Sequence, residues 1–480
     1  MSAVARPQLA VREFQSVGWV ASSLAGAEFA ALATALSLGL LVRWLAGPLL
    51  RTHIGPEQYL GIAAGILALP IVHYQLGLYP GYCLGPVERL RRRLLATVAV
   101  FGGLVAFDNL VQRGEWSRGV LLSTFVFALF LPALAEAGMR WWLIQTGRWG
   151  IPVLLLGAGE TGASIAKTLS AERQLGLVPI AFLDDTPRLW NTFVETLPVL
   201  GPMGLASDFA ERAEAVIVAL PDIGSRDVGG LLNELNFPRV IVVPNFTGMQ
   251  TLWVTARDLG GALGLEIKRN LLLHRNLVLK HFMDRAIGIP LLVASLPLLA
   301  LLALCIKIVS PRGTAFYRQR RQGLDGRVLN IWKLRTMHPD ADAVLAEWLR
   351  EHPVEQQEWT RYFKLRHDPR VLPFIGTILR RFSLDELPQL INVVRGEMSL
   401  VGPRPLPEYH LEQFPREFRE LRTRVLPGIT GLWQVTARSN GDLAVQESLD
   451  TYYIRNWSPW LDVYLLARTV SAVLLARGAY

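Results

Sequence analysis

Residues 285–310, RAIGIPLLVASLPLLALLALCIKIVS, form an apolar stretch long enough to cross a membrane, which takes roughly 20 residues. Basic residues flank this stretch on both sides. It is preceded by Lys268, Arg269, Arg275, Lys280 and Arg285 and followed by Arg312, Arg318, Arg320 and Arg321. Because cytoplasmic segments carry the excess of lysine and arginine, both ends are expected on the cytoplasmic side. Pro297 removes a backbone donor and bends a helix, and Ser295 could bond a carbonyl freed there. The stretch therefore predicts a re-entrant helix that enters, bends and returns; an ordinary fifth span is the alternative.

Four further apolar segments precede this stretch, at residues 22–45, 57–79, 94–112 and 119–143, and each is close to the length of a span. They predict a four-helix transmembrane domain over residues 1–146. The arginines are unevenly divided between the two sides of these segments. One side comprises the N-terminus, the connection between the second and third segments and the residues after the fourth, and it has Arg6, Arg12, Arg89, Arg91, Arg92, Arg93, Arg140 and Arg148. The loops on the opposite side have only Arg43, Arg51, Arg113 and Arg118. By the positive-inside rule the chain returns to the cytoplasm near residue 145.

The composition agrees with several modules, part of them in lipid, because the 480 residues are 51% hydrophobic. A formal charge of +9 would suit nucleic acid, anionic lipid or phosphate substrates equally, and it selects none of them. Cys83 and Cys305 are the only cysteines, which excludes a disulfide framework and a cysteine-rich zinc site. The N-terminal residues lack the layout of a cleaved signal peptide, so the first apolar segment is expected to remain as an anchor.

Residues 151–169, IPVLLLGAGETGASIAKTL, place Gly157, Gly159 and Gly162 between an apolar strand and a helical pattern. This spacing is typical of a Rossmann turn, in which glycines allow close backbone approach and the helix N-terminus favours a phosphate. Asp184 closes the next strand, where a ribose-binding carboxylate would fall. With two more strands, the pattern predicts a Rossmann-like α/β domain over residues 147–265. It is a possible nucleotide-binding domain, and the same glycines could equally serve strand–helix packing alone.

The chain becomes polar and rich in motifs after residue 312. Four segments stand out, at 316–337 (FYRQRRQGLDGRVLNIWKLRTM), 380–408 (RRFSLDELPQLINVVRGEMSLVGPRPLPE), 424–440 (RVLPGITGLWQVTARSN) and 449–464 (LDTYYIRNWSPWLDVY). They resemble the catalytic domain of the monotopic phosphoglycosyl transferases, the bacterial sugar transferase family, over residues 275–480. SLDELPQL followed by GEMSLVGPRP is the specific part of the resemblance. The whole chain is similar to large members of that family, which implies a linker and re-entrant helix at 266–311 and an α/β monotopic catalytic domain at 312–480.

The resemblance implies transfer of a sugar 1-phosphate, galactose 1-phosphate ahead of glucose 1-phosphate, from a UDP-sugar to undecaprenyl phosphate with release of UMP. It makes Asp385 the nucleophile, which forms an aspartyl phospho-sugar intermediate, and Glu386 a metal ligand or a base. Adjacent carboxylates also invite Mg²⁺, which neutralises phosphate charge. Ser383 could cap a helix that begins at this point.

Basic residues of the same motifs are suited to phosphate. Arg404 lies between two prolines and can present a bidentate fork to phosphate oxygens. Lys333 matches a basic position of the family, and the resemblance implies a catalytic role for both residues. Four further matched positions are expected to bind substrate: Arg380, Arg438, Asp450 and Asp462. Each could otherwise be a surface charge or a structural residue.

The resemblance also implies a multi-pass protein of the bacterial inner membrane with a cytoplasmic catalytic domain, a homodimer without a nucleic-acid partner. Its place would be the first membrane step of O-antigen, capsule or exopolysaccharide synthesis. Residues 456–477 are expected to form an interfacial helix. Leu296 departs from the family, which usually has serine directly before the bend proline. Two other classes stay open: a nucleotide-dependent sugar epimerase or oxidoreductase, supported by the glycine turn and Asp184, and a non-catalytic membrane scaffold.

Overall fold

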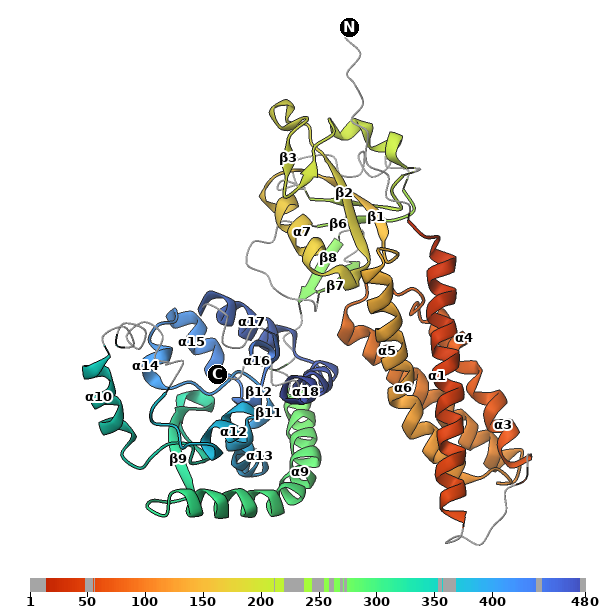
Figure 1. Cartoon of the computed structure of the whole chain (residues 1–480). Coiled ribbons are helices and arrows are strands. Elements are labelled where there is room, and N and C mark those ends of the chain that lie inside the picture. The colour runs from red at the N-terminus through yellow and green to blue at the C-terminus, as the bar shows by residue number, and fades with distance from the viewer. Residues whose placement is uncertain are drawn as a thin grey trace. The chain divides into compact units, whose positions relative to one another are not determined.

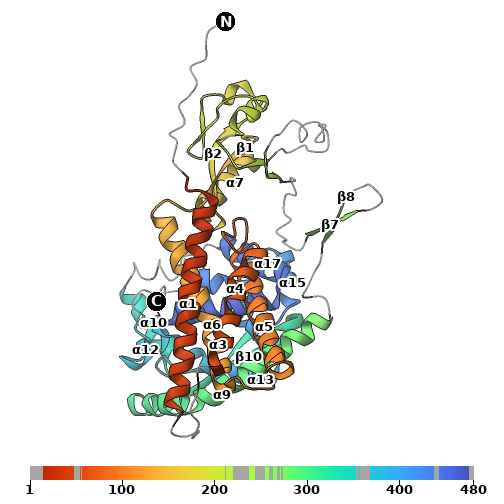
Figure 2. The same cartoon turned by 90° about the vertical axis from the view of Figure 1, so that its right-hand side faces the viewer.

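The computed structural model describes residues 14–47, 55, 57–210, 212–219, 237–243, 254–258, 263–267, 271, 274–352, 356, 368–436 and 443–474. The chain divides into two compact units, residues 1–248 and 249–480. The first unit contains a set of apolar helices followed by a parallel sheet, and the second contains a bent apolar helix and a small α/β fold (Figures 1 and 2).

Among the described residues of the first unit, three helices are long and apolar enough to cross a membrane: α1 (Val17–Leu45), α5 (Pro86–Leu110) and α6 (Arg118–Gln145). The predicted second span is wrong as a single helix, because that segment forms the shorter α3 (Glu57–Ile66) and α4 (Ala68–Gln75). Pro70 explains the interruption, since it lacks the amide that would bond the Ile66 carbonyl. The fourth helix of sufficient length and hydropathy is in the second unit.

Helix α5 begins at Pro86, earlier than the predicted span, and this changes the setting of two arginines. Arg89 and Arg93 were expected in a loop, but they lie in the helix and are 5% and 2% exposed. Arg89 donates to the Gln174 carbonyl at 3.2 Å. Arg93 bonds Glu28 of α1 and Glu136 of α6. These arginines therefore bond partners in other elements, which an apolar periodicity does not reveal.

A group of buried ionisable residues, named here the inter-helix charge cluster, connects four helices: Glu28, His73, Arg93, Glu136 and Arg140. The two Glu28 oxygens contact His73 Nδ1 at 2.6 Å and Arg93 Nη1 at 3.2 Å. The two Glu136 oxygens contact Arg93 and Arg140. Each carboxylate oxygen thus has a basic partner, as burial of a charge requires, and Arg93 serves both acids.

The sheet of the first unit has four parallel strands in the order β2-β1-β5-β6. These are β1 (Ile151–Leu156), β2 (Leu177–Leu183), β5 (Ala215–Val218) and β6 (Val240–Val242). Helix α7 (Glu160–Ala171) follows the glycine turn after β1. Strand β1 is buried along its whole length, as expected of a parallel strand covered on both faces. A parallel sheet therefore occupies the segment predicted to be Rossmann-like.

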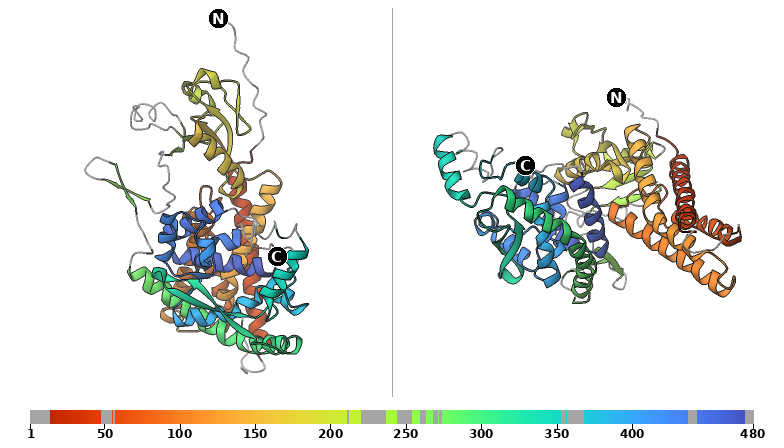
Figure 3. Two further views of the ribbon diagram at one scale, coloured as in Figure 1. Left: turned by 90° about the vertical axis from the view of Figure 1, so that its left-hand side faces the viewer. Right: turned by 60° about the horizontal axis from the view of Figure 1, so that its bottom comes forward.

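The apolar stretch of the second unit lies in α9 (His274–Val309), which contains both Pro290 and Pro297. Figures 1 and 3 show that this helix bends sharply along its length. The Ser295 hydroxyl donates to the Leu292 carbonyl at 2.8 Å. The carbonyl that loses its amide partner at Pro297 is that of Val293, so the prediction that Ser295 bonds the freed carbonyl is not confirmed. Many of its apolar side chains are exposed, among them Leu291, Val293, Leu296, Leu301, Leu304 and Ile308. Such a surface is suited to lipid.

The rest of the second unit surrounds a few short strands. Strands β9 (Phe316–Gln322) and β10 (Val328–Leu334) pair antiparallel, β11 (Ser399–Val401) pairs parallel with β12 (Gly428–Thr430), and β7 (Val254–Asp258) pairs antiparallel with β8 (Leu263–Ile267). The helices are α10 (Ala341–Glu351), α12 (Ile375–Arg381), α13 (Leu390–Arg395), α14 (Glu408–Leu411), α15 (Arg416–Thr423), α16 (Leu432–Thr436), α17 (Leu443–Asn456) and α18 (Pro459–Leu474).

Both arms of α9 are fixed to this fold. In the C-terminal arm, Leu299, Leu302 and Ile306 pack in one core with residues of β10 and α12. In the N-terminal arm, Lys280 donates to Asp462 at 2.7 Å and to the Val401 carbonyl at 2.9 Å. The helix is therefore an integral part of the second unit.

Candidate active site

The two carboxylates singled out in the sequence lie on a short 3-10 helix, η6 (Leu384–Gln389), between α12 and α13. Ser383 precedes η6 in the left-handed region at φ 54° and makes no capping hydrogen bond with its side chain. The predicted helix cap is therefore wrong, because a capping residue needs an extended backbone. Left-handed residues other than glycine are uncommon and strained. This strained turn redirects the chain from α12 to Asp385 and Glu386.

Glu386 is the centre of a group of ionic contacts. Its Oε1 accepts from Arg404 Nη2 at 2.8 Å and from Lys333 Nζ at 3.1 Å. The same Lys333 Nζ is 4.0 Å from Asp385 Oδ2. The fold thus brings together the four residues to which the sequence assigned a catalytic role, from three separate segments. We call Asp385, Glu386, Lys333 and Arg404 the carboxylate cluster.

The two carboxyl groups of the cluster differ in acidity. Burial raises the pKa of Asp385, and the Lys333 charge offsets this only in part. Burial also opposes ionisation of Glu386, but Arg404 and Lys333 outweigh it and lower the pKa of that carboxyl to about 2. Glu386 is therefore an anion that holds two cations, while Asp385 is the less closely paired acid, 4.0 Å from Lys333. Adjacent acids with pKa values shifted in opposite directions are typical of functional sites.

Lys333 is positioned by the two-stranded ribbon of β9 and β10, which is hydrogen-bonded to α13, the helix that follows Asp385 and Glu386. It lies on β10, opposite Tyr317 of β9, and is 8% exposed. Asn392 of α13 accepts from the Trp332 amide at 3.1 Å and donates to the Asn330 carbonyl at 2.9 Å. Because η6 runs directly into α13, Asn392 fixes the distance between Lys333 and the two acids.

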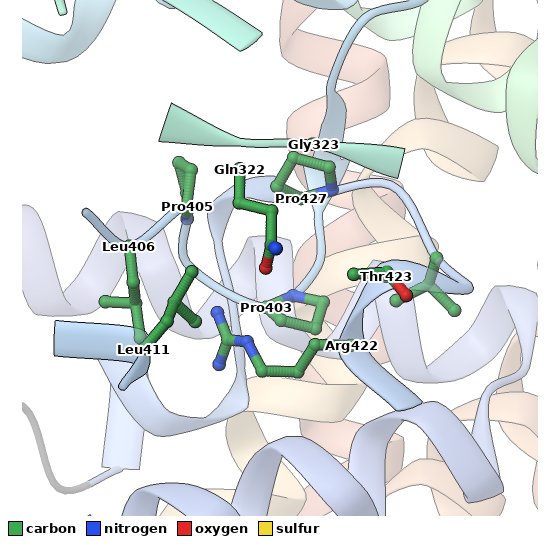
Figure 4. Close-up of a pocket in the computed structure, with 10 residues that line it drawn as sticks. Gln322, Gly323, Pro403, Pro405, Leu406, Leu411, Arg422, Thr423 and Pro427 are labelled. Carbon is green, nitrogen blue, oxygen red and sulfur yellow. The ribbon is translucent and has the colours of Figure 1, made fainter. Parts of the chain in front are cut away.

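Arg404 is held by a rigid loop, as its flanking prolines predict. The Gly402 amide donates to the Thr430 carbonyl at 2.8 Å, and the Gly428 amide donates to the Pro403 carbonyl at 3.0 Å. A Cβ on Gly402 would meet the Leu426 carbonyl at 2.6 Å, so only glycine fits. Arg422 donates to the Arg404 carbonyl, and Figure 4 shows its side chain beside Pro403 in the small pocket that this loop lines.

The residues expected to bind substrate have different settings. Arg380 donates to Thr336 Oγ1 at 3.1 Å, and its charge lowers the pKa of Asp385. Asp450 is 2% exposed and pairs with Arg422, so it is linked to Arg404 through that arginine. Asp462 is 4% exposed and pairs with Lys280. The described contacts of both aspartates thus lie outside the carboxylate cluster. Arg438 lies outside the described residues.

The glycine turn of the first unit is built as close packing requires. A Cβ on Gly162 would lie 2.0 Å from the Gly157 carbonyl oxygen, and Gly157 itself has φ 100°. Gly159 has open space where a side chain would begin. Asp184 accepts the Ala158 amide at 2.8 Å and the Thr186 amide at 2.8 Å. These bonds give Asp184 an architectural role in the turn and leave nucleotide binding there as a prediction.

Several residues of the site were not identified from the sequence: Tyr317, Arg321, Asn392 and Arg422. Asp385 contributes to the raised pKa of Tyr317, after burial, and Arg404 contributes to the lowered pKa of Arg321, again after burial. Asn392 and Arg422 position Lys333 and Arg404. Period-two alternation along β9 could have placed Tyr317 and Arg321 on one face, but nothing local marks Asn392 or Arg422.

The cluster suits a magnesium ion shared with substrate better than one enclosed by protein. Among the described residues no group of three or more His, Cys, Asp or Glu side chains is placed to hold a metal. Asp385 and Glu386 supply two adjacent carboxylates, and Mg²⁺ is commonly bound by one or two carboxylates together with substrate phosphates. One Glu386 oxygen is already bonded to two cations. The donor set fits the ion only in that shared form.

Comparison with known proteins covers both units. The family model described as bacterial sugar transferase matches residues 275–476, which include the carboxylate cluster. A second model, described as a CoA-binding domain, matches residues 75–242.

Named relatives extend the match over most of the chain. An undecaprenyl-phosphate galactose phosphotransferase from Salmonella typhimurium is 31% identical over 400 residues, 81% of this chain and 82% of that protein. A UDP-glucose:undecaprenyl-phosphate glucose-1-phosphate transferase from Xanthomonas campestris is 31% identical over 432 residues, 84% of each. The exopolysaccharide production protein ExoY of Rhizobium meliloti is 43% identical over 196 residues, 41% of this chain and 84% of ExoY. With two relatives matched over most of their own length, this chain belongs to the bacterial sugar transferase family.

Proposed function

We propose that this chain transfers a hexose 1-phosphate from a UDP-sugar to undecaprenyl phosphate and releases UMP. One observation carries the proposal: a buried carboxylate pair with Lys333 Nζ 3.1 Å and Arg404 Nη2 2.8 Å from Glu386, in a family whose members are sugar transferases. Carboxylates supply a nucleophile, and the cations neutralise the charge of phosphate groups. A protein that only supports assembly of other enzymes would have no need of this arrangement.

The reaction is a double displacement at one phosphorus atom. In the first step an Asp385 carboxylate oxygen attacks the sugar-bearing phosphorus, and the bond from that phosphorus to the UMP oxygen breaks. UMP leaves with the electron pair, and the enzyme holds an aspartyl phospho-sugar. In the second step an oxygen of undecaprenyl phosphate attacks the same phosphorus and the Asp385 carboxylate leaves. The product is an undecaprenyl diphospho-sugar, and no electrons are gained or lost overall.

The other cluster residues stabilise charge during both steps. Lys333 lies between the two acids and meets the charge that develops on the phosphoryl oxygens, while Arg404 presents its guanidinium from a rigid loop. Glu386 orients both cations. Mg²⁺, held by Asp385 and Glu386 together with substrate phosphates, would supply further neutralisation of the diphosphate.

The acceptor is a lipid, and the exposed apolar side chains of α9 support a site at the membrane surface. We place α9 as a re-entrant helix in the bacterial inner membrane, with α18 at the interface and the active site in the cytoplasm, where UDP-sugars are made. Basic residues at both ends of α9, including Arg275 and Arg312, favour that orientation. A homodimer and a role in O-antigen, capsule or exopolysaccharide synthesis complete the proposal.

Galactose is the favoured sugar, with glucose second. The relatives described above include one of each kind at 31% identity, so overall similarity does not choose between them. In the carboxylate cluster every contact concerns phosphate charge, and none reads a sugar hydroxyl.

The decisive experiment is UMP release by the purified full-length chain with a panel of UDP-sugars, with and without undecaprenyl phosphate and Mg²⁺. Continuous release is expected only with both lipid and Mg²⁺, and a burst stoichiometric with enzyme is expected without lipid. UMP release with UDP-glucose but not UDP-galactose would replace the favoured sugar. A change in the sugar without UMP release would indicate an epimerase or oxidoreductase, and no reaction with any donor would leave a scaffold.

A further inference from the structure

Arg321 has an unusual environment for a residue that the proposed reaction does not use. It lies on β9, and its Nε and Nη1 atoms are buried without a hydrogen-bond partner among the described residues. A buried guanidinium without an acceptor is costly, because each of its donors has given up water. Such a group is normally paired with a carboxylate or another anion.

The β9–β10 ribbon directs Arg321 to the side of the carboxylate cluster. Arg321 and Tyr317 are four residues apart on one strand, so they share a face, and Tyr317 is directly opposite Lys333. Lys333 reaches Glu386 from that same face at 3.1 Å. Strand alternation therefore brings the charge of Arg321 to the ribbon face that contacts the acids.

The electrostatics agree with this placement. Burial lowers the pKa of Arg321, and the neighbouring Arg404 charge lowers it further, while Tyr409, Tyr317 and Glu386 act in the opposite direction. The guanidinium groups of Arg321 and Arg404 repel each other, and the nearby Glu386 carboxylate is already bonded to Lys333. Positive charge is therefore in excess at this point. A multiply charged anion would relieve it, because both arginines could then bind oxygens of the same ligand.

We propose that Arg321 is a phosphate-binding residue of this active site and acts with Arg404 on a substrate phosphate. This inference rests on the proposed function, which brings two kinds of phosphate to the site, the diphosphate of the nucleotide donor and the monophosphate of the lipid. Arg321 stabilises the charge of whichever phosphate group it contacts and forms no covalent bond.

Arg318 provides a matched control on the same strand. It lies on the opposite face, with its Cζ 4.1 Å from the centre of the Trp332 ring. Arg318→Ala removes the same charge from the same strand without touching the face that contacts Glu386. Arg321→Lys is the second variant, because it keeps one charge but loses the fork of a guanidinium.

The test measures steady-state kinetics and pyrophosphate binding in the full-length chain. For Arg321→Ala the KM of either the UDP-sugar or undecaprenyl phosphate should rise about 10- to 100-fold, as for loss of a hydrogen bond to a charged group, with a smaller change in kcat. Arg321→Lys should recover part of that loss, and Arg318→Ala should change either KM by about twofold or less. The substrate whose KM rises identifies the phosphate.

Binding of inorganic pyrophosphate gives a readout that needs no turnover. Arg321→Ala should weaken it by about 10-fold or more while Arg318→Ala leaves it unchanged. Equal KM values and equal pyrophosphate affinities in the two alanine variants, with both folded, would overturn the inference. Absence of UMP release by the wild-type chain would instead refute the proposed function, so the two failures can be told apart.

Discussion

Two clusters of buried charge, one in each unit, use similar residues in opposite ways. The inter-helix charge cluster has two carboxylates, and each of their four oxygens contacts a basic side chain, with Arg93 shared between the two acids. In the carboxylate cluster a single Glu386 oxygen binds both Lys333 and Arg404, and Asp385 is no closer than 4.0 Å to Lys333. In the first cluster every carboxylate oxygen is saturated by the cluster's own cations, whereas the second concentrates cations around one oxygen and leaves its second acid poorly paired.

The difference shows how to tell a structural charge network from one built for a ligand. Burial also differs between the two clusters, since the side chains of the first are at most 8% exposed and those of the second are 11–35% exposed. When every carboxylate oxygen has a cation, the acids need no further partner, and removing one of them lowers the free energy of unfolding. When the cations are gathered around one oxygen, they remain able to bind the negative charge of a phosphate, and removing one of them lowers the rate of catalysis.

The largest effect is expected from Asp385→Asn, which removes the nucleophile and preserves the shape of the side chain. Turnover should fall by about 10⁴-fold or more, as for loss of a covalent catalyst. The free energy of unfolding in detergent should stay within about 0.5 kcal/mol of wild type, because the paired anion Glu386 remains. UMP release at a rate near wild type would refute the nucleophile assignment.

Glu136→Gln tests the saturated cluster. It leaves Arg93 and Arg140 without their shared carboxylate, and the free energy of unfolding should fall by about 3–5 kcal/mol. The measurement is unfolding in detergent, with the specific activity of the remaining folded protein close to wild type.

Glu88→Gln is the matched control for that measurement, because Glu88 pairs with Arg91 and Arg92 on the same helix but has a 36% exposed side chain. It should change the free energy of unfolding by about 0.5 kcal/mol or less. Equal losses in the two variants would remove the distinction between the saturated cluster and an ordinary surface pair.

Lys333→Met should cost about 10²- to 10³-fold in kcat/KM, as for removal of one preorganised cation from a transition state. The reason is that Lys333 is the residue in contact with both acids. Lys167→Met, an exposed position on α7, is the control and should keep full activity. A large fall in stability without loss of activity per folded molecule would assign the carboxylate cluster to the structural kind.

Among the substitutions within the two clusters that test a contact, His73→Leu should have the smallest effect, a loss of about 1–3 kcal/mol in the free energy of unfolding. One Glu28 oxygen would lose its 2.6 Å contact, but Arg93 would still hold the other oxygen. Unfolding of this variant and of Glu136→Gln in detergent shows which of the two loses more free energy of unfolding. A loss as large as that of Glu136→Gln would mean that His73 is as necessary to the cluster as an arginine pair.

Motifs named four residues that the fold brings together. Asp385, Glu386, Lys333 and Arg404 were named from adjacent acids, a basic motif and a proline-flanked arginine, and the fold brings them into contact. The capping role of Ser383 was wrong because backbone conformation depends on how α12 and η6 pack, which a Ser-Leu-Asp-Glu pattern does not contain. Asp450 and Asp462 were expected at the substrate, but each found a buried basic partner from another segment.

The apolar helix shows the same limit. Its length and its prolines follow from the local sequence, since each depends on residues within one or two turns, whereas the carbonyl that Ser295 bonds was not predicted. Arg93 of α5 was misplaced because Glu28 and Glu136, with which it pairs, are more than forty positions away in the chain. From sequence, an arginine next to an apolar segment is assigned to a loop, because the distant carboxylate that would pair with it inside the helix bundle is not visible locally.

The sequence by itself determined that residues 285–310 form a long apolar helix with basic flanks and that an acidic pair with phosphate-type cations follows it. Periodicity, prolines and motif spacing suffice for this, because such features act over a few residues. Only the tertiary structure decided which charges pair. It joined Glu386 to Lys333 and Arg404 across 53 and 18 positions, attached Lys280 to Asp462, and left the Nε and Nη1 atoms of Arg321 buried without a partner in the described part of the chain. Ion pairing depends on distance and burial, and those quantities exist only once the chain has folded.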